Sequence, residues 1–451
     1  MSLEEEVAAL RTQNAALAAE VVRLQALVAA LEAQLATRRD PPPFVKPNKP
    51  PPDPATKRPR QRRAPVHNHG RRRATPTEVR TQAYDTCPTC AYALRGASIA
   101  RRREVLDLPP PPPVQVIEFQ VLKRYCPHCA QWVEPALNLD GLVVGHGRVS
   151  VRIMALIGWL RTVLRLPLRQ IQTYLRQLHQ LRLSLGEIHA LLATVAAQGA
   201  APAAAIKAEL QASPVLHLDE TGWRENGQNG YVWVMTNAQG VSYFHYERSR
   251  AGAVARGLTG AHYAGTLCTD FYAAYNEHAC RHQRCWAHLL RDLAALEQQH
   301  SSAAALGEWI QAVGQLYREG RDYGRRAPPP SAAEREGKAA ELRGRAHALG
   351  LRWARAREHP AHALCQRLLR HEGELFEFVR QAGVEATNNR AERAIRPLAV
   401  ARKISGGTRS AGGSTTRMRL QTLFTSWVAK GQDPVQACLA MLQAQVPLPS
   451  S

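Results

Sequence analysis

The chain has 451 residues, which is enough for two or three domains with packed cores. Its 59 lysine and arginine residues outnumber its 37 aspartate and glutamate residues, so the formal net charge is +22 and a polyanion such as nucleic acid is the expected partner. An arginine-biased composition without such a partner is the alternative. No apolar run reaches the roughly eighteen residues of a membrane-spanning helix, so we expect no membrane partner.

The cysteines and the N-terminus indicate the compartment. Four of the nine cysteines form two CxxC pairs, which fit a metal site in a reducing compartment better than a disulfide framework. The N-terminus is acidic and lacks the basic and then apolar stretch of a secretion signal. We therefore expect a cytoplasmic protein, associated with the nucleoid through its charge.

Leucine recurs at every seventh position of residues 3–36, at Leu3, Leu10, Leu17, Leu24 and Leu31. Four residues after the first four of these leucines stand Val7, Asn14, Val21 and Val28. Leucine at d with valine at a favours a parallel two-stranded coiled coil, and a core asparagine fixes its register. Residues 1–38 are therefore predicted to form a leucine zipper that makes the protein a homodimer or higher oligomer. A single amphipathic helix packed on its own domain is the alternative.

Residues 39–83 form a predicted linker rich in proline and basic residues. Proline blocks regular structure and the like charges repel one another. Such an arm can lie along DNA phosphates, or it can serve as a solvated tether.

A small cysteine-containing module is predicted at residues 84–135. Its two CxxC pairs are Cys87 with Cys90 and Cys126 with Cys129. Four thiolates complete a tetrahedral Zn²⁺ shell, so the spacing predicts a zinc ribbon. The alternating residues 114–121 between the pairs predict a strand. A redox dithiol is the alternative.

Three short helices are predicted at residues 151–164, 168–178 and 184–197. Ser184 and Glu187 have the spacing of a capping box at the start of the third helix. Helices joined by tight turns and studded with arginine indicate a helix-turn-helix-like DNA-binding region over residues 146–205. A plain helical bundle packed under the next domain explains the apolar spacing equally well.

Strands are predicted at residues 214–218, 230–237, 241–246 and 265–269, with a helix at about 250–258 before the last strand. This is the element order of a ribonuclease-H-like α/β domain. Asp219 closes the first predicted strand and Asp270 closes the last. Alanine- and arginine-rich helices follow from about residue 286 to 382, with further helices near 415–430 and 434–444.

A third acid, Glu392, falls in a predicted helix that begins near Thr387 or Asn388, either of which can cap it. If Asp219, Asp270 and Glu392 meet, their oxygens suit a pair of Mg²⁺ (or Mn²⁺) ions over a phosphodiester. A lone aspartate at a strand end is otherwise a turn or cap residue. Glu220 follows Asp219 directly, so in a strand it points to the opposite face.

Cys280, His282, Cys285 and His288 form a second group of metal-capable side chains. Cys285 and His288 share a helix face, but the spacing fits no standard zinc template. We therefore expect Trp286 and Leu289 to pack inward, while His288, Arg291 and Asp292 support the active site or contact DNA. A bound metal is the alternative.

Basic residues cluster around and after Glu392, and glycine pairs at 406–407 and 412–413 interrupt them. Such charges next to a metal site can hold the phosphates of a cleaved strand, whereas the alternative is a solvated loop. The predicted DNA-binding residues are Arg390, Arg393, Arg396, Arg402, Lys403 and Arg409.

The chain resembles the DDE transposases of bacterial insertion sequences, of the sixty-six-type family. The matching segments are residues 219–223, 270–275, 284–292, 387–397 and 403–407. The resemblance implies that Asp219, Asp270 and Glu392 are the catalytic triad and that the element's ends and a target are the DNA substrates. It also implies that small accessory proteins of the same element assist. The rival functions are a DNA-binding regulator and a ribonuclease-H-like nuclease that cuts without joining.

The predicted architecture is a multidomain α+β protein. A coiled coil (1–38) and linker (39–83) precede the zinc-binding module (84–135) and the helical region (146–205). A ribonuclease-H-like catalytic domain (212–292 and 383–432) surrounds an all-helical insertion (293–382). A helix and tail (433–451) end the chain.

Overall fold

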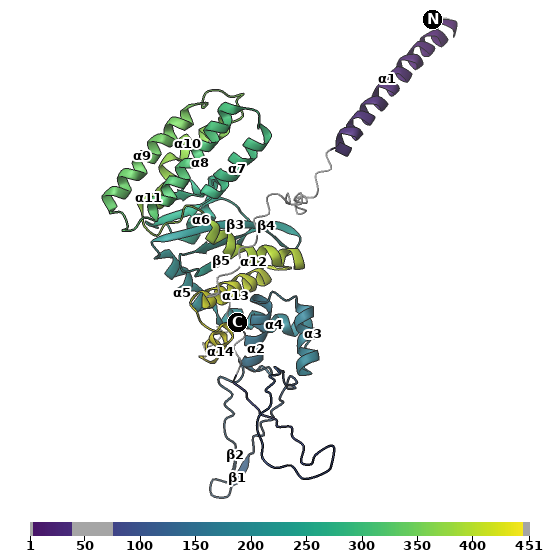
Figure 1. Cartoon of the computed structure of the whole chain (residues 1–451). Coiled ribbons are helices and arrows are strands. Elements are labelled where there is room, and N and C mark those ends of the chain that lie inside the picture. Colours follow the sequence, from purple (N-terminus) through teal and green to yellow (C-terminus); the bar gives the residue numbers. More distant parts are fainter. Residues whose placement is uncertain (1–2, 38–74, 445–451) are drawn as a thin grey trace. The chain divides into compact units, whose positions relative to one another are not determined.

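The computed structural model describes residues 3–37 and 75–444 (Figure 1). The chain divides into two compact units, Met1–Leu108 and Pro109–Ser451, and each is described by itself. Most of the predicted linker, together with the C-terminal tail, lies outside the described residues.

The first unit begins with one continuous helix, α1 (Leu3–Thr37), as the heptads predict. Leu17, Val21, Leu24 and Val28 are all about half exposed in the single chain. Such an apolar stripe fits the predicted zipper, whose pairing stays a prediction. The first CxxC pair lies in a tight turn, in which the Ala91 amide donates to the Cys87 carbonyl oxygen over 2.8 Å.

The second unit begins with the other CxxC pair, which joins the strands β1 (Arg124–Cys126) and β2 (Gln131–Val133) of an antiparallel hairpin. The strand predicted at residues 114–121 is wrong, because this segment has no strand pairing and leaves Val116 and Ile117 exposed. Alternating apolar residues form a strand only where a partner edge and a core receive them.

Four helices follow: α2 (Val151–Thr162), α3 (Leu168–His179), α4 (Leu185–Gln198) and α5 (Ala200–Gln211). The first three agree with the predicted ranges to within two residues, and the capping box of Ser184 and Glu187 is confirmed. These helices share one core with the sheet and with the last helices of the chain. The helix-turn-helix interpretation therefore stays a prediction, and the packing is that of a bundle beneath the next domain.

No single helix in residues 3–37 and 75–444 is long and apolar enough to cross a membrane. Only α4 and α5 taken together, across a 52° bend, reach that length and composition. Their apolar residues Ile188, Leu192, Val195 and Ile206 are buried in the core of the unit.

A five-stranded sheet with the order β5-β4-β3-β6-β7 forms the centre of the second unit (Figure 1). Its strands are β3 (Val215–Glu225), β4 (Gln228–Thr236), β5 (Ser242–Glu247), β6 (Thr266–Thr269) and β7 (Arg281–Arg284), and α6 (Gly252–Thr259) lies between β5 and β6. The strands β3, β4 and β5 are antiparallel, whereas β6 pairs in parallel with both β3 and β7.

Two strand predictions need correction. Asp219 does not end β3, because the strand continues to Glu225 in a long hairpin with β4. It lies instead just beyond the last residue of β3 that pairs with β6, His217. The strand β7 was not predicted because its sequence, Arg-His-Gln-Arg, has no apolar pattern, although three of its four residues are buried.

Side chains alternate between the two faces of the sheet. Leu216 and Leu218 of β3 face the core shared with α2–α5 and the C-terminal helices. Val215 faces the opposite side, where a second core is built with the helical insertion. By this alternation Asp219 lies on the side of Val215.

The helices that follow β7 are α7 (Trp286–Gln299), α8 (Ala304–Gly324), α9 (Ala332–Leu351), α10 (His362–His371) and α11 (Glu377–Arg380). The predicted insertion (293–382) begins within α7 and contains the other four. Figure 1 shows them grouped beside the sheet, around buried residues that include Trp309, Leu316 and Leu342. The chain then returns to the sheet through α12 (Asn389–Ser405), α13 (Ala411–Ala429) and α14 (Pro434–Gln443).

Candidate active site

Asp219 and Asp270 come together through the register of β3 and β6. Val215 lies opposite Thr266, and His217 lies opposite Cys268. The same register, continued by two residues, brings Asp219 level with Asp270. Neighbouring strands are about 4.8 Å apart, so the two carboxylates share one edge of the sheet.

Asn388 attaches the start of α12 to this edge. Its Nδ2 donates to the carbonyl oxygen of Leu218 over 2.7 Å, and its backbone N–H donates to Sγ of Cys285 over 3.1 Å. The prediction that its side chain caps the helix is wrong, because that side chain is 1% exposed and bonded to β3 instead. Glu392, whose N–H donates to the Asn388 carbonyl oxygen over 3.2 Å, is thereby held near Asp219.

The pKa of Asp219 responds to the charges of the neighbouring acids. Burial raises the pKa of Asp219 to about 8, and the charges of Glu220, Asp270 and Glu392 add to this effect. In the metal-free chain these groups repel one another. Carboxylate oxygens are the ligands that Mg²⁺ prefers, so the donor set fits divalent cations that would relieve the repulsion.

Glu220 is not part of this group, as its position predicts. It lies on the other face of the sheet, with its side chain only 2% exposed. The Arg250 guanidinium donates to its Oε1 over 2.5 Å, and the Tyr275 hydroxyl donates to its Oε2. Its charge is therefore engaged in a structural network.

Arg284 supports the site, a role that the sequence did not predict. It is fully buried, and its Nη1 donates to the carbonyl oxygen of Asp270 over 3.0 Å. Its Nε donates to Oε2 of Glu374 in the insertion over 2.5 Å. Arg284 thus ties the loop of Asp270 to the insertion. The one available signal was its position at the start of a matching segment.

Of the four predicted metal-capable residues Cys280, His282, Cys285 and His288, only the last two lie in the candidate active site. Cys285 and His288 lie beside Glu392, and Nε2 of His288 is 3.9 Å from Oε1 of Glu392. His282 instead has its Nε2 3.1 Å from the carbonyl oxygen of His278. The expected packing of Trp286 and Leu289 is confirmed, since both are buried.

Asp292, expected to support the site or contact DNA, pairs with Arg367 of the insertion over 2.5 Å. It therefore holds α7 against α10.

The predicted basic residues fall into two sets. Arg390 pairs with Glu385 over 2.7 Å, and Arg402 donates to the carbonyl oxygen of Gly222. These two side chains hold α12 in place. The exposed members of the set are Arg393, Arg396, Lys403 and Arg409.

The glycine-rich segment after α12 is docked on the β3–β4 hairpin. Gly407 has a φ of +114°, and a Cβ there would lie 2.1 Å from the carbonyl oxygen of Arg224, so only glycine fits. The Thr408 N–H donates to that same oxygen over 2.9 Å. Gly412 and Gly413 lie in the first turn of α13, so this glycine pair is helical and does not form a solvated loop.

Each CxxC pair has backbone amides directed at a thiol. The Thr89 amide lowers the pKa of the Cys87 thiol, and the Cys129 amide lowers the pKa of the Cys126 thiol. Zinc binds thiolates, so each turn is suited to metal binding.

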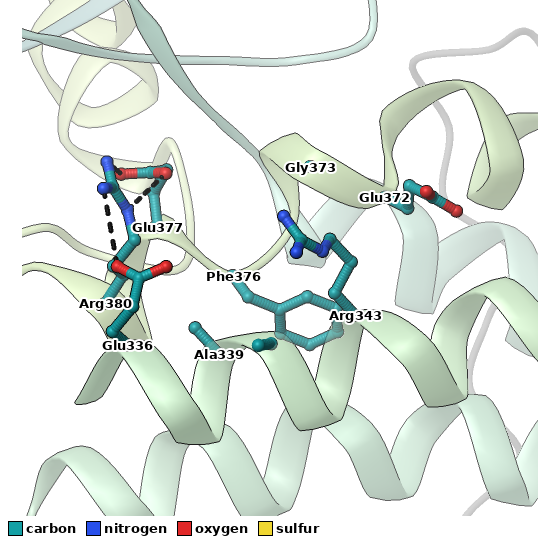
Figure 2. Close-up of a pocket in the computed structure, with 9 residues that line it drawn as sticks. Glu336, Ala339, Arg343, Glu372, Gly373, Phe376, Glu377 and Arg380 are labelled. Carbon is teal, nitrogen blue, oxygen red and sulfur yellow. Dashed lines mark hydrogen bonds and ion pairs between the residues drawn. The ribbon is translucent and has the colours of Figure 1, made fainter. Parts of the chain in front are cut away.

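A small pocket in the insertion lies away from the acids (Figure 2). It has a volume of about 130 Å³ and is lined by residues of α9 and α11, among them Glu336, Arg343 and Arg380. Figure 2 shows the Arg380 guanidinium between Glu336 and Glu377, and it lies 2.7 Å from Glu377 and 3.7 Å from Glu336. Arg380 is thus paired with two carboxylates, and the lining includes none of Asp219, Asp270 and Glu392, so the pocket is not part of the candidate active site.

Comparison with known proteins identifies the class. A family model described as "Transposase IS66 family" matches residues 146–416, more than half of the chain. A model described as "zinc-finger binding domain of transposase IS66" matches residues 85–130, which include all four cysteines of the CxxC pairs. The two models together define the class: a chain with the catalytic-type and zinc-finger regions of a transposase family. It belongs to the IS66 transposase family.

One curated relative, "Uncharacterized protein y4qI" of Sinorhizobium fredii, is 30% identical over 213 residues. The match covers 43% of this chain and 38% of that protein, so the chain spans less than half of its relative's length.

Proposed function

We propose that the protein binds the ends of an insertion sequence and catalyses Mg²⁺-dependent strand cleavage and strand transfer. The observation that carries the proposal is the convergence of Asp219, Asp270 and Glu392 from β3, the end of β6 and α12. The sheet order, with an antiparallel β3–β4–β5 followed by parallel β6 and β7, supports a ribonuclease-H-like catalytic domain.

The acids have distinct roles in this proposal. Asp219 would share both metal ions, Asp270 would hold one and Glu392 the other. When bound, two divalent ions activate the attacking oxygen and stabilise the leaving oxygen of an in-line displacement. In the first displacement water attacks a phosphodiester and frees a 3′ hydroxyl. In the second, that hydroxyl attacks target DNA and releases a target 3′ hydroxyl.

The exposed side chains of Arg393, Arg396, Lys403 and Arg409 are placed in this proposal on the phosphates of the cleaved strand. Phosphate contacts fix the register of the DNA over the acids without reading its sequence. Arg390 donates to the carbonyl oxygen of Ala238 in the β4–β5 turn, and Arg402 donates to that of Gly222 in β3, so in this proposal they orient α12 and with it Glu392.

The remaining parts supply assembly and DNA binding. Cys87, Cys90, Cys126 and Cys129 would hold one Zn²⁺, and the zinc finger with α2–α4 would contact the element's ends. The exposed stripe of α1 would make the homodimer or higher oligomer. The protein would act on DNA in the cytoplasm, with accessory proteins of the element as further partners.

A strand-transfer assay on labelled DNA that carries the element's ends tests the proposal. We expect end-containing DNA to be joined to a target in Mg²⁺ or Mn²⁺ and not in chelator. Hydrolysed ends without joined product would identify a nuclease that cuts only. Binding of the ends without cleavage would identify a DNA-binding regulator.

Metal analysis tests the zinc proposal. We expect about one zinc per chain, and we expect Cys126→Ala to release it and to unfold residues 84–135, because small zinc modules fold with their metal. Cys438→Ala, at a buried cysteine of α14, is the matched control and should keep the zinc. A zinc-free wild-type protein would remove the proposal.

A further inference from the structure

Cys285, His288 and Glu392 form a group of three metal-capable side chains, which we call the Cys-His-Glu cluster. One ligand atom from each residue lies within 4.8 Å of the other two. Cys285 and His288 belong to the start of α7, and Glu392 belongs to the first turn of α12. Within residues 3–37 and 75–444 no other such group of three is found.

The donor atoms of the cluster differ from those of the two aspartates. Asp219 and Asp270 offer only oxygen, which suits Mg²⁺. The cluster offers sulfur, nitrogen and oxygen, which is a typical ligand set for Zn²⁺. Donors around tetrahedral zinc are about 3.3–3.8 Å apart, given bonds of about 2.0–2.3 Å, so small side-chain rotations would close the site.

The surroundings of Cys285 hold its sulfur in place. Cys285 is 1% exposed, and its backbone N–H donates to the carbonyl oxygen of Thr269 over 2.8 Å. The Asn388 N–H donates to its Sγ over 3.1 Å, so the sulfur is held at the start of α12, beside Glu392.

The histidine has an unsatisfied nitrogen. Nδ1 of His288 is buried and has no hydrogen-bond partner, whereas Nε2 faces Glu392 at 3.9 Å. An orphan nitrogen in a buried position is costly unless something outside the chain satisfies it. The side chains of His288 and Glu392 are 30% and 37% exposed, which leaves a metal ion a path from solvent and room for a water as fourth ligand.

We propose that the Cys-His-Glu cluster is a second zinc site, separate from the zinc finger, and that zinc bound there inhibits the enzyme. Zinc on Glu392 withdraws this carboxylate from the magnesium ions. Zinc binding at the cluster does not depend on the proposed function. Inhibition by that zinc rests on the proposed function, because it presupposes strand transfer at Glu392.

Cobalt is the probe for the site, because a thiolate bound to Co²⁺ gives a charge-transfer band in the near ultraviolet. Co²⁺ is titrated into the full-length protein with its zinc-finger zinc retained. We expect wild type to gain a band of one-thiolate intensity, and Cys285→Ser to gain none. Serine keeps an acceptor for the Asn388 N–H, so the variant preserves the local bonding. His288→Ala should weaken Co²⁺ binding about tenfold or more.

Two matched control variants test whether the loss of the cobalt band is specific to the Cys-His-Glu cluster. Cys365→Ser changes another buried cysteine, in α10, and should keep the band. Asp219→Asn changes the proposed magnesium site and should also keep it. A cobalt spectrum that is the same in wild type and Cys285→Ser overturns the proposed site, whatever the protein does to DNA.

Inhibition is measured as end joining at fixed Mg²⁺ with added Zn²⁺, relative to each variant's own rate without zinc. Wild type should lose joining at micromolar zinc, and Cys285→Ser should need about tenfold more. Equal zinc sensitivity would overturn the inhibitory role. Failure of wild type to join ends without zinc would instead count against the proposed function, while the cobalt result would stand.

Discussion

Asp219→Asn is expected to bind end DNA normally but to join ends roughly three orders of magnitude more slowly than wild type, the scale typical of losing one member of a catalytic unit. The amide cannot carry the charge that two divalent ions share. Joining is measured on end-containing DNA, and binding by electrophoretic mobility shift. Glu308→Gln, an exposed acid on α8, is the matched control and should join at the wild-type rate. Normal joining by Asp219→Asn would mean that the catalytic assignment is wrong.

The same substitution has a pH-dependent effect on stability. The pKa of Asp219 is about 8 in the folded chain, mainly through burial, against an ordinary value of 3.8. The folded state therefore keeps a proton that the unfolded state releases, and the metal-free protein loses stability as the pH rises from about 4 to 8. In Asp219→Asn the side chain does not ionise, so this pH-dependent loss of stability should be absent.

We expect Asp219→Asn to be more stable than wild type in chelator, with a difference in the free energy of unfolding of a few kcal/mol at pH 9 and little at pH 4. Urea unfolding at the two pH values measures it. A difference that does not change with pH would contradict the burial of the Asp219 charge. Because metal must displace the proton, Mg²⁺ affinity should also rise with pH up to about 8.

Arg284→Met is expected to lower the free energy of unfolding by roughly 1–3 kcal/mol, because it removes the charged hydrogen bonds of a fully buried guanidinium and leaves Glu374, which is 31% exposed, with only His371 as a partner. The loss also removes the donor to the Asp270 carbonyl oxygen. The folded fraction should therefore join ends slowly and require more Mg²⁺. Urea unfolding and the Mg²⁺ dependence of joining measure the two effects.

Glu374→Gln is the matched control. It breaks the same ion pair but keeps the Arg284–Asp270 bond, so it should cost stability with a smaller effect on the Mg²⁺ requirement. Equal Mg²⁺ requirements in the two variants would show that Arg284 acts on stability alone. Burial would raise the pKa of Glu374, but His371 and Arg284 outweigh it and hold that pKa at about 2. The contribution of the pair is thus present above about pH 4.5 and is lost as the pH falls towards 2.

Short sequence patterns by themselves predicted many of the helices and strands of this protein. The heptads predicted α1, the capping box predicted the start of α4, and four of the five strands around the acids were found within a few residues, except that β3 runs on to Glu225. These features depend on periodicity and on partners three or four residues away, which the sequence displays directly. The matching segments likewise identified the family.

The tertiary structure decided what depends on distant partners. The strand β7 is polar and becomes buried because Arg284 meets Glu374 of the insertion, whereas residues 114–121 have a strand pattern but no partner edge. Asn388 had the spacing of a cap but bonds to β3. Cys285 and His288 meet a third metal-capable side chain only because α12 returns Glu392 to them across the whole insertion. Sequence spacing reports neighbours along a helix or strand, but contacts between elements arise only when the core packs.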